Sequence, residues 1–320
     1  IPMARVPGDL PVERVGAQRV AKILEVLQAA ADADGGMLLE DRTRLGLVYR
    51  DRSSMYTQDP VITLTYGQPG LAPPLEPDDE ADIFRNDRTV QRDGGSEARA
   101  VLETGRLSVQ APPDGIGLYD DSATLSLADD VQTEPIAYWR LHHGTYDGAR
   151  YPSVTVKLHQ APGLIPAALA MREGDIIRIT NLPGHVAYGD IDLLVTGWAE
   201  TLLPRTWVRT FTCEPGGPWN LAVTDHAVYG KAGTAGAILD ADVDADDTAL
   251  SVQVPLAWTI DSGEMPILID VGGEHMSVTA IGAVSGGVQA FTVVRSVNGV
   301  IKPHLEGAAL ALAHPAIASL

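Results

Sequence analysis

The sequence predicts an α+β fold of mostly antiparallel strands: a barrel-bearing unit with two helices, followed by a small all-β domain at the C-terminal end. Three observations predict it. Apolar and polar residues alternate in many short runs, as they do in half-buried strands. Glycine (32 residues) and proline (22 residues) separate these runs, as they do at turns. Only two stretches have helical apolar spacing, which argues against a regularly alternating, doubly wound sheet.

The N-terminal region predicts a linker and then the first helix. Residues 1–11 contain three prolines and begin at Ile1, so we expect a linker from an N-terminal region of a longer product. Residues 12–34 predict the helix, which Gly35 ends because glycine accepts the left-handed conformation found there. Its apolar stripe follows the i, i+3, i+4 spacing: Val20, Ile23, Leu24, Leu27 and Ala31.

Short strands and turns follow, with the second helix among them. Residues 122–143 predict this helix, which Pro135 must start, kink or split. Its expected apolar side consists of Leu125, Val131, Ile136, Trp139 and Leu141. Expected strands are 37–39 paired with 45–49, then 61–66, 86–92, 99–109, 153–159, 176–180, and the long antiparallel pair 191–203 with 205–213.

The C-terminal module begins after a glycine-rich joint at residues 230–236, which divides the chain into units 12–230 and 231–320. A first strand is expected over residues 249–254. Tight turns are expected at Gly272-Gly273 and Asn298-Gly299, because these residues tolerate positive φ. Between them the chain alternates: Met276, Val278 and Ala280 face one side, and His275, Ser277 and Thr279 the other.

Composition limits the classes of partner. The net charge is −19, which argues against nucleic-acid or anionic-membrane binding through a general basic surface. No apolar run reaches the ~18 residues that a membrane-spanning helix needs. Cys213 is the single cysteine, so an internal disulfide framework is excluded, and its apolar surroundings predict a buried side chain.

Candidate metal ligands and catalytic residues do not form a recognisable pattern. The acidic run Asp240–Asp247 resembles an EF-hand opening, but Ala245 and Ser251 stand where glycine and glutamate are needed. His142 and His143 are expected to stabilise a helix end through the dipole. The remaining histidines considered lack metal-site spacing: His185, His226, His275, His304 and His314. We therefore predict no catalytic, cofactor-binding or metal-binding residues, and no cofactor.

An ordered series of motifs covers nearly the whole chain and resembles minor tail proteins of actinobacterial (Streptomyces-type) phages and prophages. The C-terminal motifs are GGE (272–274), M-x-VT (276–279), FTV-x-RSVNG (291–299) and K-x-H (302–304). The others are DADGG (32–36), LGL (45–47), ND (86–87), APPDG (111–115), WR (139–140), GT (144–145), RYP (150–152), GD (174–175), and GW with a following glutamate (197–200).

The resemblance implies a structural virion protein of the tail tip. Residues 12–230 would form a barrel-bearing baseplate hub, a homotrimer on the tail axis that caps or adapts the tube and passes DNA. Strand edges within residues 36–214 would pair between subunits. Other implied partners are distal tail or tube proteins and tail-fibre or tip proteins. The module at 231–320 would face outward, as a joint to fibres or towards the host.

Two other hypotheses come from different classes of protein. The first is an adhesin that binds host-surface glycan through residues 231–320, with a shallow exposed cluster that includes Trp258. The second is an enzyme that cuts cell-wall polymer, which would need a carboxylate pair at glycosidase spacing. Tryptophan can serve as a sugar platform, but its large apolar area favours packing for all five: Trp139, Trp198, Trp207, Trp219 and Trp258.

Overall fold

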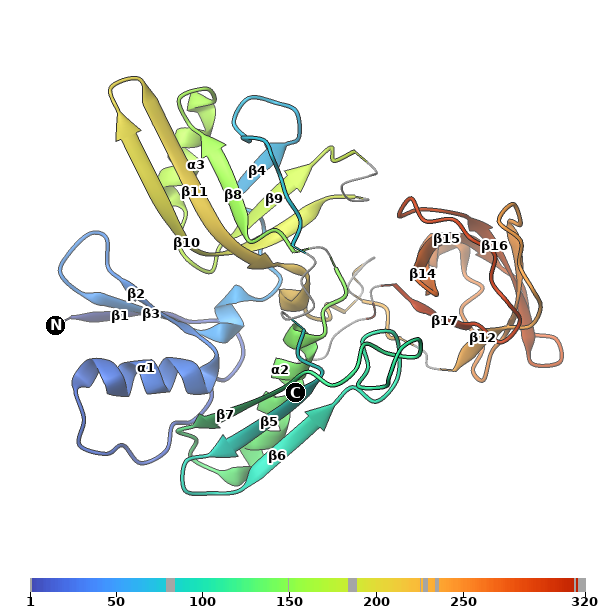
Figure 1. Cartoon of the computed structure of the whole chain (residues 1–320), viewed down its shortest axis with the longest axis horizontal. Coiled ribbons are helices and arrows are strands. Elements are labelled where there is room, and N and C mark those ends of the chain that lie inside the picture. Colours follow the sequence, from blue (N-terminus) through green and yellow to red (C-terminus); the bar gives the residue numbers. More distant parts are fainter. Residues whose placement is uncertain are drawn as a thin grey trace. The chain divides into compact units, whose positions relative to one another are not determined.

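The computed structural model describes residues 2–313 and 315, apart from 79–83, 149, 184–188, 225, 227–229, 234–235 and 314. The chain divides into two compact units, one built mainly from residues 2–180 and 191–220, the other mainly from residues 221–313. Figure 1 shows both units. Within the described part of the chain, no helix combines the length and hydropathy that crossing a bilayer requires.

The fold class is α+β with mostly antiparallel strands, as predicted. The described residues of the first unit form three α-helices: α1 (Ile23–Asp34), α2 (Thr133–Gly144) and α3 (Ile165–Ala170). Helix α3 was not expected from the sequence. It is short and begins at Ile165, with Pro166 in its first turn, where proline's fixed φ suits the helix and its missing N–H leaves no hydrogen bond unmade.

Three open sheets make up the β-structure described in the first unit. The first has the order β1–β3–β2, from β1 (Met3–Val6), β2 (Met37–Glu40) and β3 (Leu47–Arg50). The second has the order β6–β5–β7, from β5 (Asp87–Arg92), β6 (Glu97–Val101) and β7 (Asp120–Leu125). The third has the order β4–β9–β10–β11–β8, from β4 (Ile62–Thr65), β8 (Ser153–Lys157), β9 (Ile176–Thr180), β10 (Ile191–Leu203) and β11 (Thr206–Pro215).

The predicted linker over residues 1–11 is wrong for its first half, because β1 pairs in parallel with β3. The prolines at positions 2 and 7 flank this strand instead of interrupting it, so the amides of residues 3–6 remain available for pairing. The partner strand lies more than 40 residues further along the chain. The composition of residues 1–11 alone therefore could not predict this pairing.

The first helix begins at Ile23, not at residue 12 as predicted. Residues 12–22 instead run in extended form beside the segment after β7, where Val15 bridges Leu127 and the Gly16 N–H donates to the Ser126 carbonyl (3.1 Å). The end of the helix is as predicted, with Gly35 in the left-handed conformation at φ 73°. The predicted apolar stripe is buried only at its C-terminal end, and Ile23 and Leu24 are exposed.

The second predicted helix is also shorter, because residues 122–125 belong to β7. This strand pairs in parallel with β5 over its whole length, and its period-two burial outweighs the helical spacing of Leu125 and Val131. Val131 is consequently exposed. Helix α2 begins at Thr133 and places Pro135 in its first turn, where it removes no helical hydrogen bond.

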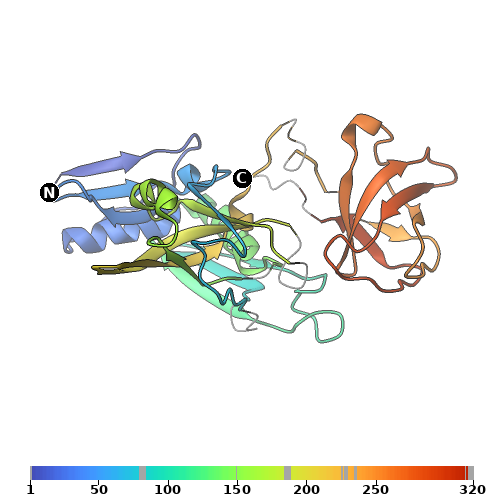
Figure 2. The same ribbon diagram turned by 90° about the horizontal axis from the view of Figure 1, so that it is seen from above.

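The expected long hairpin at 191–213 is confirmed, but the sheet that contains it is open. β10 and β11 pair over residues 193–203 and 206–215 with a bulge between Val195 and Gly197. β9 covers only residues 191–194 of β10, and β8 only residues 208–212 of β11. The hairpin therefore projects beyond its neighbours, as Figures 1 and 2 show.

The closed barrel lies in the second unit, whereas the sequence placed a barrel within residues 12–230. Its order is β12–β13–β16–β15–β14–β17, which returns to β12. The strands are β12 (Ala237–Leu239), β13 (Ala249–Gln253), β14 (Ile267–Val271), β15 (Glu274–Ile281), β16 (Val288–Val294) and β17 (Ala309–Leu312). Closure gives every one of these strands a partner on both sides.

The barrel core follows the predicted alternation with one exception. Met276, Val278, Phe291 and Val293 are all buried. Ala280 was expected on the same face, yet it is exposed because a bulge between Val278 and Ala280 shifts the register. The extra residue turns Ile281 inward in its place, as a β-bulge does.

Candidate functional site

The acidic run Asp240–Asp247 uses its carboxylates to order its own loop. Asp240 accepts hydrogen bonds from Gln253 Nε2 (2.7 Å) and Ser251 Oγ (3.2 Å). Asp247 Oδ2 accepts one from the Asp244 N–H at 2.8 Å. Across the described residues, no group of three or more His, Cys, Asp or Glu side chains is arranged to hold a metal ion.

Among the described residues, the scattered histidines singled out in the sequence form no common cluster. His185 and His314 lie outside the described residues. His275 Nε2 lies 3.3 Å from Asp270 Oδ2 across the β14–β15 hairpin. His304 belongs to a different contact, described below, and His226 lies at the start of the second unit.

His143 is part of an aromatic cluster at the C-terminal end of α2. Its ring centroid lies 4.4 Å from Trp139 and 4.7 Å from Trp219, which belongs to the 3-10 turn Gly217–Trp219. Burial lowers the pKa of His143 to about 3, and burial also lowers the pKa of His142. Both rings are therefore neutral at pH 7. The expected charge–dipole role is wrong, and for His143 it is replaced by aromatic packing.

A buried polar network connects three of the C-terminal motifs. Glu274 Oε1 accepts from Arg295 Nε (2.6 Å), and Oε2 accepts from Arg295 Nη2 (2.8 Å) and His304 Nε2 (2.8 Å). The backbone N–H groups of Ser296 and Lys302 also donate to this carboxylate. The GGE, RSVNG and K-x-H motifs thus meet at one fully buried side chain.

The electrostatics of this network fix Glu274 as an anion. Burial alone would raise its pKa, but hydrogen bonds from Arg295 and His304 outweigh burial and hold it at about 2. Arg295 also donates through Nη1 to the carbonyls of Asp244 (2.6 Å) and Asp247 (3.1 Å), so it ties the acidic loop to the barrel. With five donors around it and no exposed surface, the carboxylate has no face left for a substrate.

From the sequence, only the tight turns at Gly272-Gly273 and Asn298-Gly299 were expected in these motifs, and the network was not expected. The alternation of the strands did contain a sign of this network. Glu274 is an even number of residues from Met276 and Val278, and Arg295 is an even number of residues from Phe291 and Val293, so each charged residue faces the same side of its strand as those core residues. A charged residue in phase with the core residues of each strand predicts a buried pair.

The projecting part of the β10–β11 hairpin, residues 197–207, is called the arm below. Near its base, Trp198 lies between Arg42 (5.1 Å) and Arg209 (5.2 Å), and Arg209 Nη2 pairs with Glu200 Oε2 at 3.0 Å. At its tip the side chains of Leu202 and Leu203 are 69% and 58% exposed. The arm thus has side-chain contacts near its base and exposed leucines at its free end.

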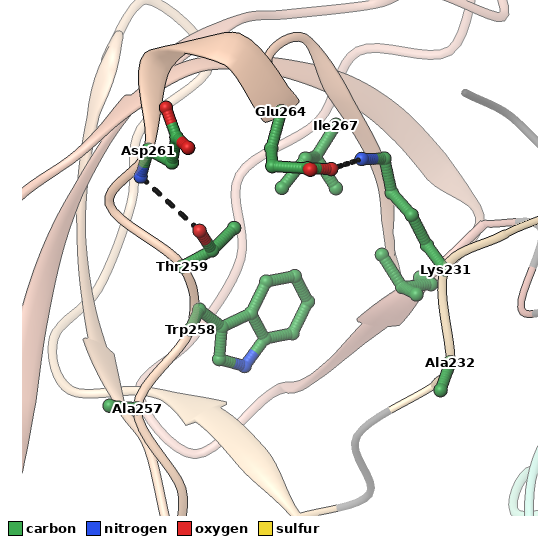
Figure 3. Close-up of a pocket in the computed structure, with 9 residues that line it drawn as sticks. Lys231, Ala232, Ala257, Trp258, Thr259, Asp261, Glu264 and Ile267 are labelled. Carbon is green, nitrogen blue, oxygen red and sulfur yellow. Dashed lines mark hydrogen bonds and ion pairs between the residues drawn. The ribbon is translucent and has the colours of Figure 1, made fainter. Parts of the chain in front are cut away.

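A pocket of about 400 Å³ lies at one end of the barrel. Figure 3 shows Trp258 along one side and the Lys231–Glu264 ion pair along the other, with Nζ and Oε2 2.5 Å apart. The loop between β13 and β14 supplies most of the lining. The complete lining consists of Lys231, Ala232, Ala257, Trp258, Thr259, Asp261, Glu264, Ile267 and Leu312.

Comparison with known proteins gave matches among solved structures alone: no family model and no curated protein matches this chain. It is similar to a 43 kDa tail protein of prophage MuSo2 from Shewanella oneidensis, with 12% identity and a TM-score of 0.43. It is also similar to a tail protein from Neisseria meningitidis MC58, with 11% identity and a TM-score of 0.45. Each match covers 68% of this chain.

These alignments cover 61% and 62% of the two tail proteins, so this chain spans less than two thirds of either. With TM-scores below 0.5, the likeness is partial and does not by itself establish a shared function.

Proposed function

We propose that this chain is a structural protein of a phage tail, and that its first unit assembles with copies of itself through the arm. The ordered motifs along the sequence support the tail assignment. The arm is the structural observation that supports assembly. The proposal assigns the chain no catalytic step.

The arm has the properties of an incomplete interface. A two-stranded ribbon is only marginally stable in water, and its edges are templates for further pairing. On the β9 side, the described backbone pairing of β10 ends at Val195, so the backbone from Gly197 to Leu203 lies along an edge that another strand can join. Full burial of a leucine contributes about 1.5–3 kcal/mol, so covering Leu202 and Leu203 would favour association.

In the proposed assembly, three copies form a hub at the tail tip, each donating its arm to a neighbour. Such a ring of heterologous contacts closes and leaves no arm unsatisfied. The hub would cap or adapt the tail tube, contacting tube proteins on one side and fibre or other tip proteins on the other. A net charge of −19 would keep DNA from binding as it passes.

Electron cryomicroscopy of particles of the phage that encodes this chain tests the proposal. We expect three copies at the tail tip, with arm residues 197–207 of each copy against its neighbour. Six or more copies along the tube wall, or absence of the chain from the tip, would overturn the tail-tip assignment. Three copies that meet through other surfaces would overturn the role of the arm alone.

A further inference from the structure

The pocket at the end of the barrel has the size of a ligand-binding site and an ordered lining. Its volume of about 400 Å³ falls within the range of small-molecule sites, about 300–1,000 Å³. Trp258 was expected in a shallow exposed cluster, but it is 8% exposed and lies within the pocket wall. The pocket therefore offers a recess bounded by the indole, instead of an open aromatic platform.

The position of Trp258 is fixed from behind by a buried side chain. Gln289 accepts from the Trp258 backbone N–H through Oε1 (2.8 Å) and donates through Nε2 to the Trp258 carbonyl (3.2 Å). The same Nε2 also donates to the Gly282 carbonyl at 2.9 Å. The indole packs against Phe291 with centroids 5.4 Å apart and planes at 60°. Little conformational freedom is left for a ligand to remove.

The polar wall is ordered as well. Asp261 Oδ1 accepts from the Gly263 N–H (2.9 Å) and so caps the 3-10 turn Ser262–Glu264. The Asp261 N–H in turn donates to Thr259 Oγ1 at 3.2 Å. This turn presents Glu264 towards Lys231, as Figure 3 shows. Two carboxylates, one ammonium and one hydroxyl thus belong to the pocket lining.

The mixed composition of the lining favours one chemical class of ligand. Its large apolar side chains, Trp258, Ile267 and Leu312, suit a flat C–H face, and its polar side chains suit several hydroxyl groups. Asp261 and Glu264 against Lys231 leave the lining with a net charge of −1, and the chain carries −19, so anions are disfavoured. A sugar ring without acidic groups has both the apolar face and the hydroxyl edge.

We infer that this pocket binds one or two rings of a neutral saccharide, with a ring face against Trp258 and hydroxyl groups on Asp261, Glu264 and Lys231. Leu256 and Ile260, in the same loop, are exposed and give a longer glycan further apolar contact. The inference does not depend on the assembly role of the arm, because all of these residues lie in the second unit.

Calorimetric titration of the full chain tests the inference. The probes are three neutral disaccharides, N,N′-diacetylchitobiose, cellobiose and lactose, with glucose 6-phosphate as the anionic comparator. So small a contact supports weak binding, with Kd of about 1 mM. At least one neutral disaccharide should bind saturably, and glucose 6-phosphate should bind more weakly.

The variants separate recognition from folding. The double substitution Asp261→Asn and Glu264→Gln lies at the partly exposed rim and should weaken binding at least about fivefold, since charged hydrogen bonds are lost. Trp258→Leu should abolish binding. If this substitution unfolds the barrel, the Asp261→Asn and Glu264→Gln variant alone tests whether the pocket binds the sugar. Glu306→Gln, an exposed control elsewhere on the barrel, should bind as the wild-type chain does.

Three results would overturn the inference. One is that no neutral disaccharide of the panel binds at up to about 10 mM, well above the expected Kd. Another is that the rim variant binds as tightly as the wild-type chain. The third is that glucose 6-phosphate binds as tightly as the neutral sugars, which would assign the pocket to anions.

Discussion

In the first unit β10 and β11 run past the strands beside them, and the far part of β10 has no second strand partner among the described residues, whereas in the second unit six strands close into a barrel. The contrast extends to side chains. Leucines are exposed at the tip of the arm, while the barrel buries even a glutamate among five hydrogen-bond donors. The five-stranded sheet of the first unit is therefore open, which is the basis of the proposed assembly, whereas the sheet of the second unit closes on itself.

The largest effect is expected from breaking the network that holds the barrel loops. Glu274→Ala would leave Arg295 and its charge buried without an anion, which costs about 3–5 kcal/mol. Chemical denaturation should show a destabilised second unit and an unchanged first unit. Glu306→Gln serves as the control. A loss below about 1 kcal/mol would mean that the network does not hold the barrel together.

Acid should act on the barrel through the same residue. The pKa of Glu274 is held at about 2 against an ordinary value of 4.5, so its stabilisation is complete above pH about 4.5 and is lost as pH falls towards 2. The shift corresponds to roughly 3 kcal/mol. Urea denaturation of wild-type and Glu274→Gln chains at several pH values measures the difference. Parallel pH dependences in the two chains would contradict the assignment.

The first unit offers the opposite case, a largely enclosed group that stays neutral. Since the pKa of His143 is lowered to about 3 from 6.5, folding favours its neutral form, and stability falls as pH drops from about 6.5 towards 3. Histidine NMR signals should show no titration of His143 between pH 8 and 5, with His143→Phe identifying its signal. A midpoint near pH 6.5 would show that the aromatic cluster admits water.

Local patterns in the sequence were enough to predict much of the fold. The β2–β3 and β10–β11 hairpins and the alternation in β15 and β16 are encoded by neighbouring residues, and the structure contains them. The errors concern strands whose partners are distant in sequence. β1 needs β3, β7 needs β5, and residues 12–22 need the segment after β7. Propensity alone could not choose among these pairings.

The candidate sites were less predictable than the fold. The Glu274 network joins positions 274, 295 and 304, and the pocket joins positions 231, 258, 264 and 312. Because Glu274 is an even number of residues from the core residues of its strand, its burial could be predicted, but the identity of its partners could not. For the arm, the hairpin was predictable, but the exposure of Leu202 and Leu203 depends on how far β8 and β9 extend.

The mass of the chain in solution tests most directly whether the first unit completes its sheet with other copies. Sedimentation equilibrium should give three times the 33.9 kDa of one chain. Leu202→Glu with Leu203→Glu should give a folded monomer, because both side chains are exposed, and Leu305→Glu, an exposed leucine of the second unit, should leave the trimer intact. A wild-type monomer at about 100 μM, or a trimer that survives the arm variant, would contradict the account.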